Sequence, residues 1–380
     1  MTASPCTVEV ITTSDGLAEL GPVWDQLVAR AGVTHPFITH AWIQTWWECF
    51  GTGAELFVLL VRADGEPIAI APFMRTTERI CGARHRCLRF LANDHTPRSD
   101  FIVAARSADA YGAICKFLMS QSADWDVLQL RDVPSDSRTL QELASHAAQY
   151  GFLSGIRRSA DSLVLPTTFG WERYMESLPP KRRWFLRNRL KRLSKRGRVS
   201  LETVTGGTDL LDALEDGYRL EAAAWKEKAG TAIRCRPEIR RFYTSLAQRS
   251  AARGWLRLQF LKVDQRRVAF AYCLAYEQRM YLLKPGFDPE YAAFSPGNLL
   301  CYLALQDVYA SGFVAYDFLG YADYWKRQWA NQSMGHSTLF LYADRPLTRL
   351  DHYTKFALIP LLRQVPFYAR LRDLVLGQTL

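Results

Sequence analysis

Two stretches of alternating apolar and polar residues, two hundred positions apart, have nearly the same pattern. "VRADGEPIAIAPF" begins at Val61, and "LKVDQRRVAFAYC" begins at Leu261. In each, an apolar run meets a polar turn at an aspartate, Asp64 or Asp264, and a second apolar run follows. This pattern is typical of two strands joined by a tight turn. We therefore expect a β-hairpin at each place.

The segments around the two hairpins also repeat in the same order. Two helical patterns precede each hairpin, and a strand, a helix and a further strand follow it. In chain order the segments are 17–32, 40–51, 86–93, 108–120 and 124–133 in the first half, and 208–230, 236–254, 279–288, 296–312 and 313–320 in the second. An order repeated over a whole half predicts a duplicated α/β protein, in which each half is a mixed β-sheet covered by helices.

Proline and glycine residues between positions 165 and 180 predict the break between the two halves. We expect an N-terminal domain over 1–168 and a second domain over 169–350, which suits a chain of 380 residues. The remaining segment, 351–380, mixes aliphatic residues with arginine and lysine. This composition predicts an amphipathic tail that contacts a membrane surface or packs against the second domain.

The charge of the chain is concentrated in one short segment. The protein has 48 basic and 38 acidic residues, and ten of the basic ones lie between Lys181 and Arg198, where there is no acid. Leucines at 186, 190 and 193 form an apolar stripe at helical spacing, so we predict a basic helix over 180–197 that packs by one face. A packed helix without a recognition motif argues against nucleic-acid binding and favours the attraction of phosphate groups.

Several classes of protein are excluded by what the sequence lacks. It has no secretory signal pattern and no apolar run long enough for a membrane span. Its eight cysteines and seven histidines are dispersed without metal-ligand spacing, so we predict no metal. We expect a cytoplasmic protein, or one peripheral to the inner face of the membrane.

A turn of small residues precedes the predicted helix at 296–312. Ser295, Gly297 and Asn298 stand there, at a helix N-terminus where free backbone N–H groups and the helix dipole attract an anion. Gly297 would let a phosphate approach the backbone closely. The alternative is an ordinary helix start.

Charged residues near the last predicted strand are the candidates for catalysis. Asp317 interrupts an apolar strand and therefore needs a partner, and Lys326 is the nearest candidate in the sequence. Tyr324 and Trp325 surround the lysine with aromatic surface, which would lower its pKa or orient it. The alternative interpretation is a structural Asp–Lys pair.

Taken together, these motifs resemble the GNAT acyltransferase fold in duplicate. The chain is similar to a bacterial acetyltransferase family of cellulose and exopolysaccharide biosynthesis, which is related to the Fem-type aminoacyl transferases. The matching stretches are "HPFITHAWIQTWW", "IAIAPF", "DWDVLQLRDVP", "KRRWFLRNRLKRLSKRG", "AAWKEKAGTAI", "SPGNLL" and "YDFLGYADYWKRQW". The chain departs from the family at Trp325, where the family has tyrosine, and at Tyr321, where it has glycine.

This resemblance implies two tandem GNAT-like domains and transfer of an acyl group from acyl-CoA to an amine or hydroxyl acceptor. It implies that Ser295, Gly297 and Asn298 bind the pyrophosphate. Asp317 and Lys326 would organise the reacting centre, and Tyr324 would give a proton to the leaving thiolate. The remaining candidates, Tyr281, Lys284 and Trp325, would line the acceptor cleft.

Two alternative functions share this fold. One is a Fem-type transfer from aminoacyl-tRNA, which would explain the basic segment through phosphate contacts. The other is a scaffold protein that has kept the fold without the chemistry. Binding of an acyl-CoA in the absence of tRNA would favour the acyl-CoA-dependent transferase over both alternatives.

Overall fold

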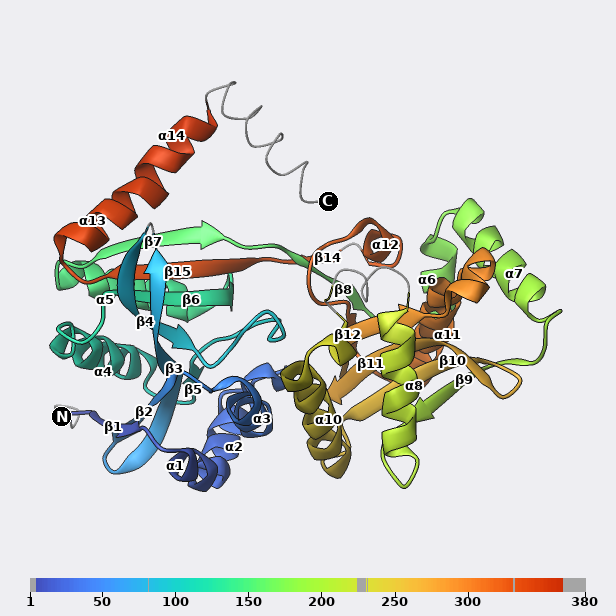
Figure 1. Ribbon diagram of the computed structural model, residues 1–380, viewed down its shortest axis with the longest axis horizontal. Helices are drawn as coiled ribbons and strands as arrows, with labels where there is room; N and C mark the ends of the chain where they lie inside the picture. Colours follow the sequence, from blue (N-terminus) through green and yellow to red (C-terminus); the bar gives the residue numbers. More distant parts are fainter. Residues whose placement is uncertain (1–4, 81, 224–229, 231, 331, 365–380) are drawn as a thin grey trace. The chain divides into compact units, whose positions relative to one another are not determined.

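The protein is described by a computed structural model that covers residues 5–80, 82–223, 230, 232–330 and 332–364. Contacts divide the chain into two compact units, each built around its own β-sheet (Figure 1). Unit 1 consists of residues 1–32, 53–159 and 335–380, and unit 2 of residues 33–52 and 160–334. The predicted fold class is confirmed, since both sheets are mixed and flanked by helices.

Unit 1 contains an eight-stranded sheet in the order β1-β2-β3-β4-β6-β15-β7, with β5 paired to β3. Only β4 and β6 pair in parallel, and the other neighbours are antiparallel. The strands are β1 (Thr7–Ile11), β2 (Glu55–Ala63), β3 (Glu66–Ile80), β4 (Ala83–Phe90), β5 (Ile102–Val103), β6 (Val127–Pro134), β7 (Leu153–Arg158) and β15 (His336–Tyr342).

Helices α4 (Ser107–Ser120) and α5 (Arg138–Gln149) cover one face of this sheet. Their leucine and isoleucine side chains join those of alternate strand residues, such as Leu59 and Val61, in one buried core. Helix α2 (Gly21–Arg30) lies against β3 and β5 and follows the short α1 (Ser14–Glu19). Successive side chains of a strand point to opposite faces of the sheet, so alternate strand residues are the ones that pack against α4.

Unit 2 contains a seven-stranded sheet in the order β14-β8-β13-β12-β11-β10-β9. Here β12 and β13 are the parallel pair. The strands are β8 (Ser162–Pro166), β9 (Val199–Val204), β10 (Leu256–Val263), β11 (Arg266–Tyr276), β12 (Arg279–Phe287), β13 (Ala315–Asp317) and β14 (Gln332–Met334).

Two groups of helices cover the faces of the unit 2 sheet. Helix α11 (Pro296–Ala310), with α6 (Trp171–Ser177) and α7 (Pro180–Leu193) beside it, packs on the face that presents Ala269 and Ala271. Helix α8 (Leu210–Ala222) packs on the other face, where Gly217 allows close contact with the ring of Phe270. Helices α3 (His40–Phe50) and α10 (Pro237–Ala252) contact each other, and short helices η1 (Pro36–Ile38), η2 (Ile233–Cys235), η3 (Pro289–Phe294) and α12 (Tyr324–Arg327) complete the unit.

The two predicted hairpins are present and share an irregularity. Strand β2 pairs with β3 and β10 with β11, with a register shift between Val61 and Arg62 in the first hairpin and between Leu261 and Lys262 in the second. Both turns begin with an aspartate of φ 53°, Asp64 or Asp264. Because a bulge and a left-handed residue recur at equivalent positions, the duplication seen in the sequence extends to the backbone.

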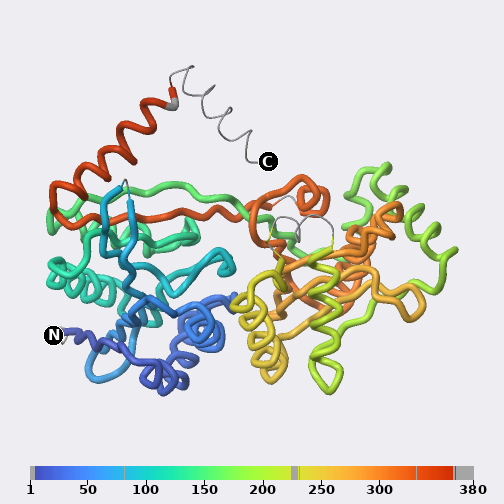
Figure 2. Tube along the Cα trace, in the orientation of Figure 1, coloured from blue at the N-terminus to red at the C-terminus, as the bar shows by residue number. Residues whose placement is uncertain are grey.

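The units do not follow the predicted boundary at 168 and 169. Helix α3 comes from the first half of the chain but belongs to unit 2, because Trp42 packs against Phe242 (ring centroids 5.4 Å apart) and Glu48 pairs with Arg249 (2.8 Å). Conversely, β15 follows the second repeat but pairs with β6 and β7 of unit 1. Figure 2 shows residues 336–342, in red, beside the green residues 153–158.

The tail begins with helix α13 (Pro346–Tyr353), continues through the turn η4 (Thr354–Leu358) and ends in α14 (Ile359–Arg363). It packs on unit 1: the His352 ring lies 3.1 Å from the carbonyl oxygen of Ser154, and Phe356 packs on Phe340. The expectation that the tail packs on the second domain is therefore wrong for these residues. Arg370 and Arg372 lie outside the described residues.

Candidate functional site

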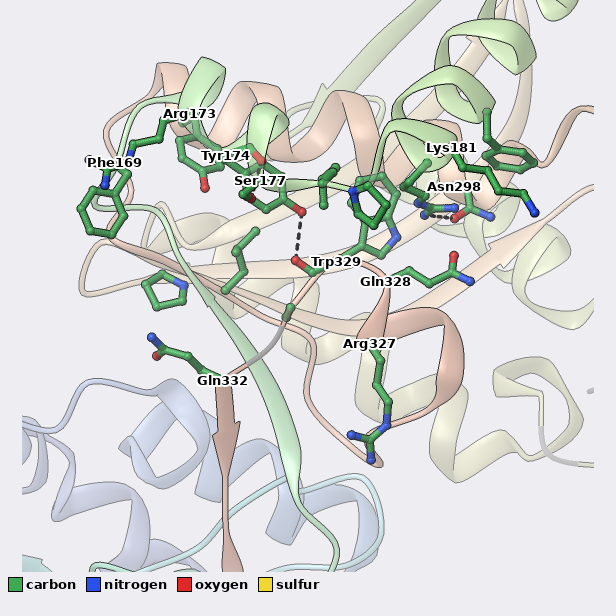
Figure 3. A pocket seen from close by; sticks show the side chains of 18 of the residues that line it. Phe169, Arg173, Tyr174, Ser177, Lys181, Asn298, Arg327, Gln328, Trp329 and Gln332 are labelled. Atoms are coloured by element: carbon green, nitrogen blue, oxygen red, sulfur yellow. Dashed lines mark hydrogen bonds between the residues drawn. The ribbon is translucent and has the colours of Figure 1, made fainter.

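Unit 2 contains a cavity of about 980 Å³ on the side of the sheet that α11 covers (Figure 3). Its walls are α6, the first turns of α7 and α11, strand β8 and the segment from α12 to β14. Aromatic and basic side chains dominate the lining, and none of the described residues that belong to it is acidic. The cationic members are Arg173, Lys181, Arg182 and Arg327, and the aromatic ones are Phe169, Tyr174, Phe185, Tyr309, Tyr324 and Trp329.

Arg182 joins the basic helix α7 to this cavity. Its Nη2 donates a hydrogen bond to Asn298 Oδ1 (2.6 Å) at the start of α11, and its guanidinium lies 4.5 Å from the centre of the Trp329 ring. Burial lowers the pKa of Arg182 from its ordinary value, and its Nε has no hydrogen-bond partner in the described part of the chain. The guanidinium also lies 5.5 Å from the centre of the Phe185 ring. A partly desolvated cation whose neighbours are an amide oxygen and aromatic rings, without a carboxylate among the described residues, favours an anionic ligand.

The other three cations of the cavity also lack carboxylate partners among the described residues. Arg173 lies over the ring of Phe169, and Arg327 Nε donates to the carbonyl oxygen of Ala322 (3.0 Å). Arginines elsewhere commonly pair with acids, as Arg267 does with Glu202 and Asp216. The positive charge of the cavity is therefore available to a ligand.

The first turn of α11 brings one of the predicted phosphate-binding residues, Asn298, to the cavity. Ser295 precedes the helix in a left-handed conformation (φ 56°, ψ 56°), and Asn298 lines the cavity. A Cβ atom added at Gly297 would meet only Phe287 Cδ1, at 3.7 Å. The backbone of this turn is thus open on the side of its glycine, as an approaching phosphate requires.

Asp317 ends the short strand β13 at the place where two parallel strands separate. The register of β12 with β13 covers Arg279–Tyr281 and Ala315–Asp317, and no described strand pairs with β12 beyond that point on this side. On its other side, β12 opposes Tyr272 with Lys284 and Cys273 with Leu282, so that Leu283 is an extra residue. A bulge leaves one residue unpaired and bends the strand. The separation therefore opens the backbone of β12 for another molecule.

Asp317 is buried and holds the loop that follows it, because its Oδ1 accepts a hydrogen bond from the N–H of Leu319 (2.9 Å). Lys326 is also buried, and its Nζ donates to the carbonyl oxygens of Leu319 (2.6 Å) and Tyr321 (2.8 Å). Both charged residues thus fix the same loop, residues 319–321.

The ion pair of Lys326 is with Asp323 (3.6 Å). Burial lowers the pKa of Lys326 from its ordinary value, and Asp323, then Asp317, act in the opposite direction. The predicted partner Asp317 is therefore near the lysine but contributes less than Asp323. This arrangement directs two protons of the ammonium group to carbonyl oxygens of the loop and places its charge near Asp323.

The predicted aromatic neighbours of Lys326 have different environments. Tyr324 is 80% exposed and lines the cavity, whereas Trp325 packs edge-on against Phe318 (ring centroids 5.9 Å apart). Of the nine predicted site residues, the cavity lining brings together Tyr324 and Asn298.

Tyr281 and Lys284 lie among the aromatic residues that border α10. The Tyr281 hydroxyl donates to the carbonyl oxygen of Thr34 (2.5 Å), and its ring packs against Phe37. Lys284 Nζ lies 5.6 Å from the centre of the Tyr243 ring. Neither belongs to the lining of the large cavity, so their predicted role at an acceptor cleft stays a prediction.

The sequence pattern predicted a basic helix that packs by its leucines and has an exposed charged face, but it did not single out Arg182. The spacing of residues 182, 186 and 193 places Arg182 on the same face as the buried Leu186 and Leu193. A helical wheel could therefore have shown that it points inward. Helix α7 also ends at Leu193, before the predicted end at Gly197.

Two further observations concern membrane-spanning helices and metal sites. Within the described residues, no helix is both long and apolar enough to cross a bilayer. The same residues hold no group of three or more histidine, cysteine, aspartate or glutamate side chains placed to bind a metal.

Comparison with known proteins identifies the fold of this site. Residues 180–327 match the family described as "Acetyltransferase (GNAT) domain". FemX has a similar structure, with 13% identity over 91% of this chain and 100% of that chain and a TM-score of 0.60. A conserved protein of unknown function from Bacteroides thetaiotaomicron is also similar, with 10% identity over 88% of this chain and 100% of that chain and a TM-score of 0.53. A tandem GNAT protein from the clavulanic acid biosynthesis pathway matches with 13% identity over 88% and 98% of the two chains and a TM-score of 0.46.

No curated protein matches the sequence. The matched segment begins with α7 and ends with α12, and it contains the turn of α11, the parallel strands and Lys326. The resemblance to a GNAT domain is thus confirmed for residues 180–327, while the likeness to enzymes of cellulose and exopolysaccharide biosynthesis stays a prediction. Most of the motif "AAWKEKAGTAI" used for that likeness lies outside the described residues.

Proposed function

We propose that the protein is an acyltransferase that transfers an acyl group from acyl-CoA to an amine or hydroxyl acceptor, with the donor bound by unit 2. One observation carries the proposal: among the described residues, the lining of the unit 2 cavity has four cationic side chains and no carboxylate. Coenzyme A has three phosphate groups, which need such unpaired cations, and an adenine, which suits the aromatic walls.

The turn before α11 binds the pyrophosphate in this proposal. Ser295, Gly297 and Asn298 supply the N-terminal end of a 15-residue helix, and Arg182 adds a full positive charge next to Asn298. The helix dipole and the guanidinium act in the same direction, because both stabilise negative charge at the same place. Lys181, the residue directly before Arg182 in α7, adds a further cation.

The reacting centre lies where β12 and β13 separate. The thioester arm enters this gap, and a backbone amide at the bulge of Leu283 polarises the thioester carbonyl. The acceptor nitrogen attacks the carbonyl carbon, the bond from carbon to sulfur breaks, and Tyr324 gives its proton to the sulfur. The proton that the acylated nitrogen loses returns to the Tyr324 oxygen through solvent, so that the tyrosine is restored. Asp317 and Lys326 position this centre through the loop 319–321 rather than by proton transfer, because their hydrogen bonds end on the loop backbone.

The acceptor side is assigned to Tyr281, Lys284 and Trp325. An acceptor in envelope or exopolysaccharide metabolism and a cytoplasmic location belong to this proposal. Peripheral contact of the tail with a membrane belongs to it as well, and is supported by the exposed Leu347, Leu350 and Leu361 on α13 and α14.

A second candidate is transfer from aminoacyl-tRNA, as the Fem-type resemblance implies. The similarity in fold to FemX and the basic helix α7 favour it. In that case the same cavity would hold the phosphates of the 3′ end of the tRNA. A non-catalytic scaffold with this fold is the remaining alternative.

The test is a panel of acyl-CoA thioesters, assayed by release of free CoA with amine and sugar acceptors. We expect release with at least one thioester, and its loss in Lys326→Ala, where loop 319–321 loses the two hydrogen bonds that the ammonium group donates to its carbonyl oxygens. A matched control is Lys116→Ala, an exposed lysine of α4 in unit 1. Thermal unfolding of each variant separates loss of activity from loss of the fold.

The outcomes separate the three candidates. CoA release without tRNA supports the main proposal. Transfer that requires aminoacyl-tRNA, with no stabilisation of the protein by any thioester, would overturn it in favour of the second candidate. If the protein binds neither donor, the non-catalytic scaffold is the remaining candidate.

A further inference from the structure

Helix α7 has two faces of different character. Leu186 and Leu193 are fully buried in the core of unit 2, and α7 contacts α11 on this side. At 100° per residue, positions 184, 187 and 191 point away from these leucines. Their side chains are exposed, as is that of Lys195 just after the helix. We call Trp184, Arg187, Lys191 and Lys195 the outer face of α7.

The outer face combines an exposed tryptophan with unpaired cations. Trp184 is 65% exposed, whereas a tryptophan is on average highly buried. No carboxylate in the described residues pairs with Arg187, Lys191 or Lys195, and residues 181–198 contain no acid. The face therefore contributes little to the stability of the fold, and both its charge and its ring are available to a partner.

We propose that the outer face of α7 binds the surface of a bilayer that contains anionic phospholipids. Tryptophan prefers the level of the headgroups, where its apolar ring is buried while its N–H remains hydrated. Lysine and arginine on the same helix are attracted to anionic headgroups on either side of the ring. The partner is thus recognised by a row of cations around one interfacial aromatic residue.

The geometry of the outer face distinguishes a bilayer from a small anion. The cavity takes its α7 residues from Lys181, Arg182 and Phe185, and none of the four outer residues lines it. Small phosphates are bound where several donors converge, whereas these side chains diverge from a convex helix. A row of side chains on a convex surface can instead contact a plane along the whole helix.

The test is co-sedimentation of the full chain with vesicles of phosphatidylcholine, either alone or mixed with phosphatidylglycerol. We expect binding only to the mixed vesicles, and its loss at high salt. Each basic residue near an anionic surface strengthens binding about fivefold, so the reversal Arg187→Glu should weaken it roughly 25-fold. Lys116→Glu on α4 of unit 1 changes the charge by the same amount at another exposed position and should have little effect.

Trp184→Ala should weaken binding about tenfold, because less apolar surface is buried at the headgroups. Its control is Tyr150→Ala, which removes an exposed aromatic residue of unit 1. Trp184→Phe provides a second readout: the fluorescence shift of the protein on adding mixed vesicles should diminish. Thermal unfolding should be unchanged in all these variants, because the side chains are exposed.

Three results would overturn the inference. The first is that the wild-type protein binds no mixed vesicles, and the second is that the controls and the outer-face variants weaken binding equally. Alternatively, binding of tRNA that is lost in Arg187→Glu, without binding to vesicles, would assign the face to nucleic acid. Acyl-donor binding measured without vesicles should be the same in all variants, so that failure here leaves the proposed function untouched.

Discussion

The two units have the same order of meander, helix and parallel strand, but their cavities differ in size and in charge pairing. In unit 1, Arg89 and Arg131 line a cavity of about 30 Å³, and they pair with Glu78 and Asp94. In unit 2, the cavity is about 980 Å³, and no carboxylate among the described residues pairs with its arginines. Of these two cavities, the second has both the room and the unpaired charge that a phosphate-rich donor requires.

The first turns of the equivalent helices α4 and α11 differ in the same way. Each helix is preceded by a left-handed residue, Arg106 (φ 45°) in unit 1 and Ser295 (φ 56°) in unit 2. Arg106 pairs with Asp64 and Asp109, so the charged side chains at this turn of unit 1 are paired with one another. Both units thus have a helix N-terminus of this kind. The one in unit 1 is surrounded by paired side chains, whereas the one in unit 2 is open to a ligand.

The largest expected effect is on the donor. Arg182→Ala should raise the KM for acyl-CoA roughly 10- to 100-fold, because one charge-assisted contact to a phosphate is lost. The control in unit 1, Arg106→Ala at the start of α4, should leave the KM within about twofold. Steady-state kinetics with varied donor measures both. An equal rise in the two variants would remove the distinction between the units.

The next effect is on stability and belongs to unit 1. Asp100 is half-buried, and desolvation of its carboxyl raises its pKa from 3.8 to about 6, despite hydrogen bonds from Thr139 (2.5 Å) and from the N–H of Phe101 (2.8 Å). Because the folded pKa lies above the unfolded one, the stabilising effect is complete below about pH 4 and is lost as the pH rises through about 6. Ionisation in the folded state therefore costs roughly 3 kcal/mol at neutral pH.

Asp100→Asn removes this cost, and its amide oxygen can still accept the two hydrogen bonds. The variant should be more stable than the wild type by up to roughly 3 kcal/mol at about pH 8 and similar to it at about pH 4. Urea denaturation across this range measures the difference. A constant difference at all pH values would show that Asp100 does not titrate as stated.

The smallest effect compares the two hairpin turns. Asp264 Oδ1 accepts a hydrogen bond from the N–H of Arg198 (2.8 Å), whereas Asp64 makes an exposed ion pair with Arg106 (3.1 Å). Both residues have φ 53°, so the strain of alanine is the same in the two turns. We expect Asp264→Ala to cost about 1 kcal/mol more than Asp64→Ala. Urea denaturation of the two variants measures this, and the reverse order would contradict it.

Local patterns predicted much of the fold. Alternation around Asp64 and Asp264 revealed both hairpins, and the leucines at 186 and 193 indicated the buried face of α7. The pairing of β15 with β6 and the place of α3 beside α10 were not predictable, because they depend on contacts between residues far apart in the sequence.

The site was predicted less completely. Asn298 and Tyr324 do line the cavity, but the partner of Lys326 is Asp323 instead of Asp317. Sequence spacing suggested the more distant aspartate, whereas the turn into α12 brings the nearer one to the lysine. Arg182 was missed because a run of ten cations conceals which of them points inward.

The most direct test of the central claim is the number of coenzyme A molecules that one chain binds. Isothermal titration of the full-length protein with coenzyme A measures that number, and Arg182→Ala and Arg106→Ala serve as the paired variants. We predict one site per chain, lost or weakened at least tenfold in Arg182→Ala and kept in Arg106→Ala. Two equivalent sites, or one site that Arg182→Ala leaves unchanged, would contradict the account.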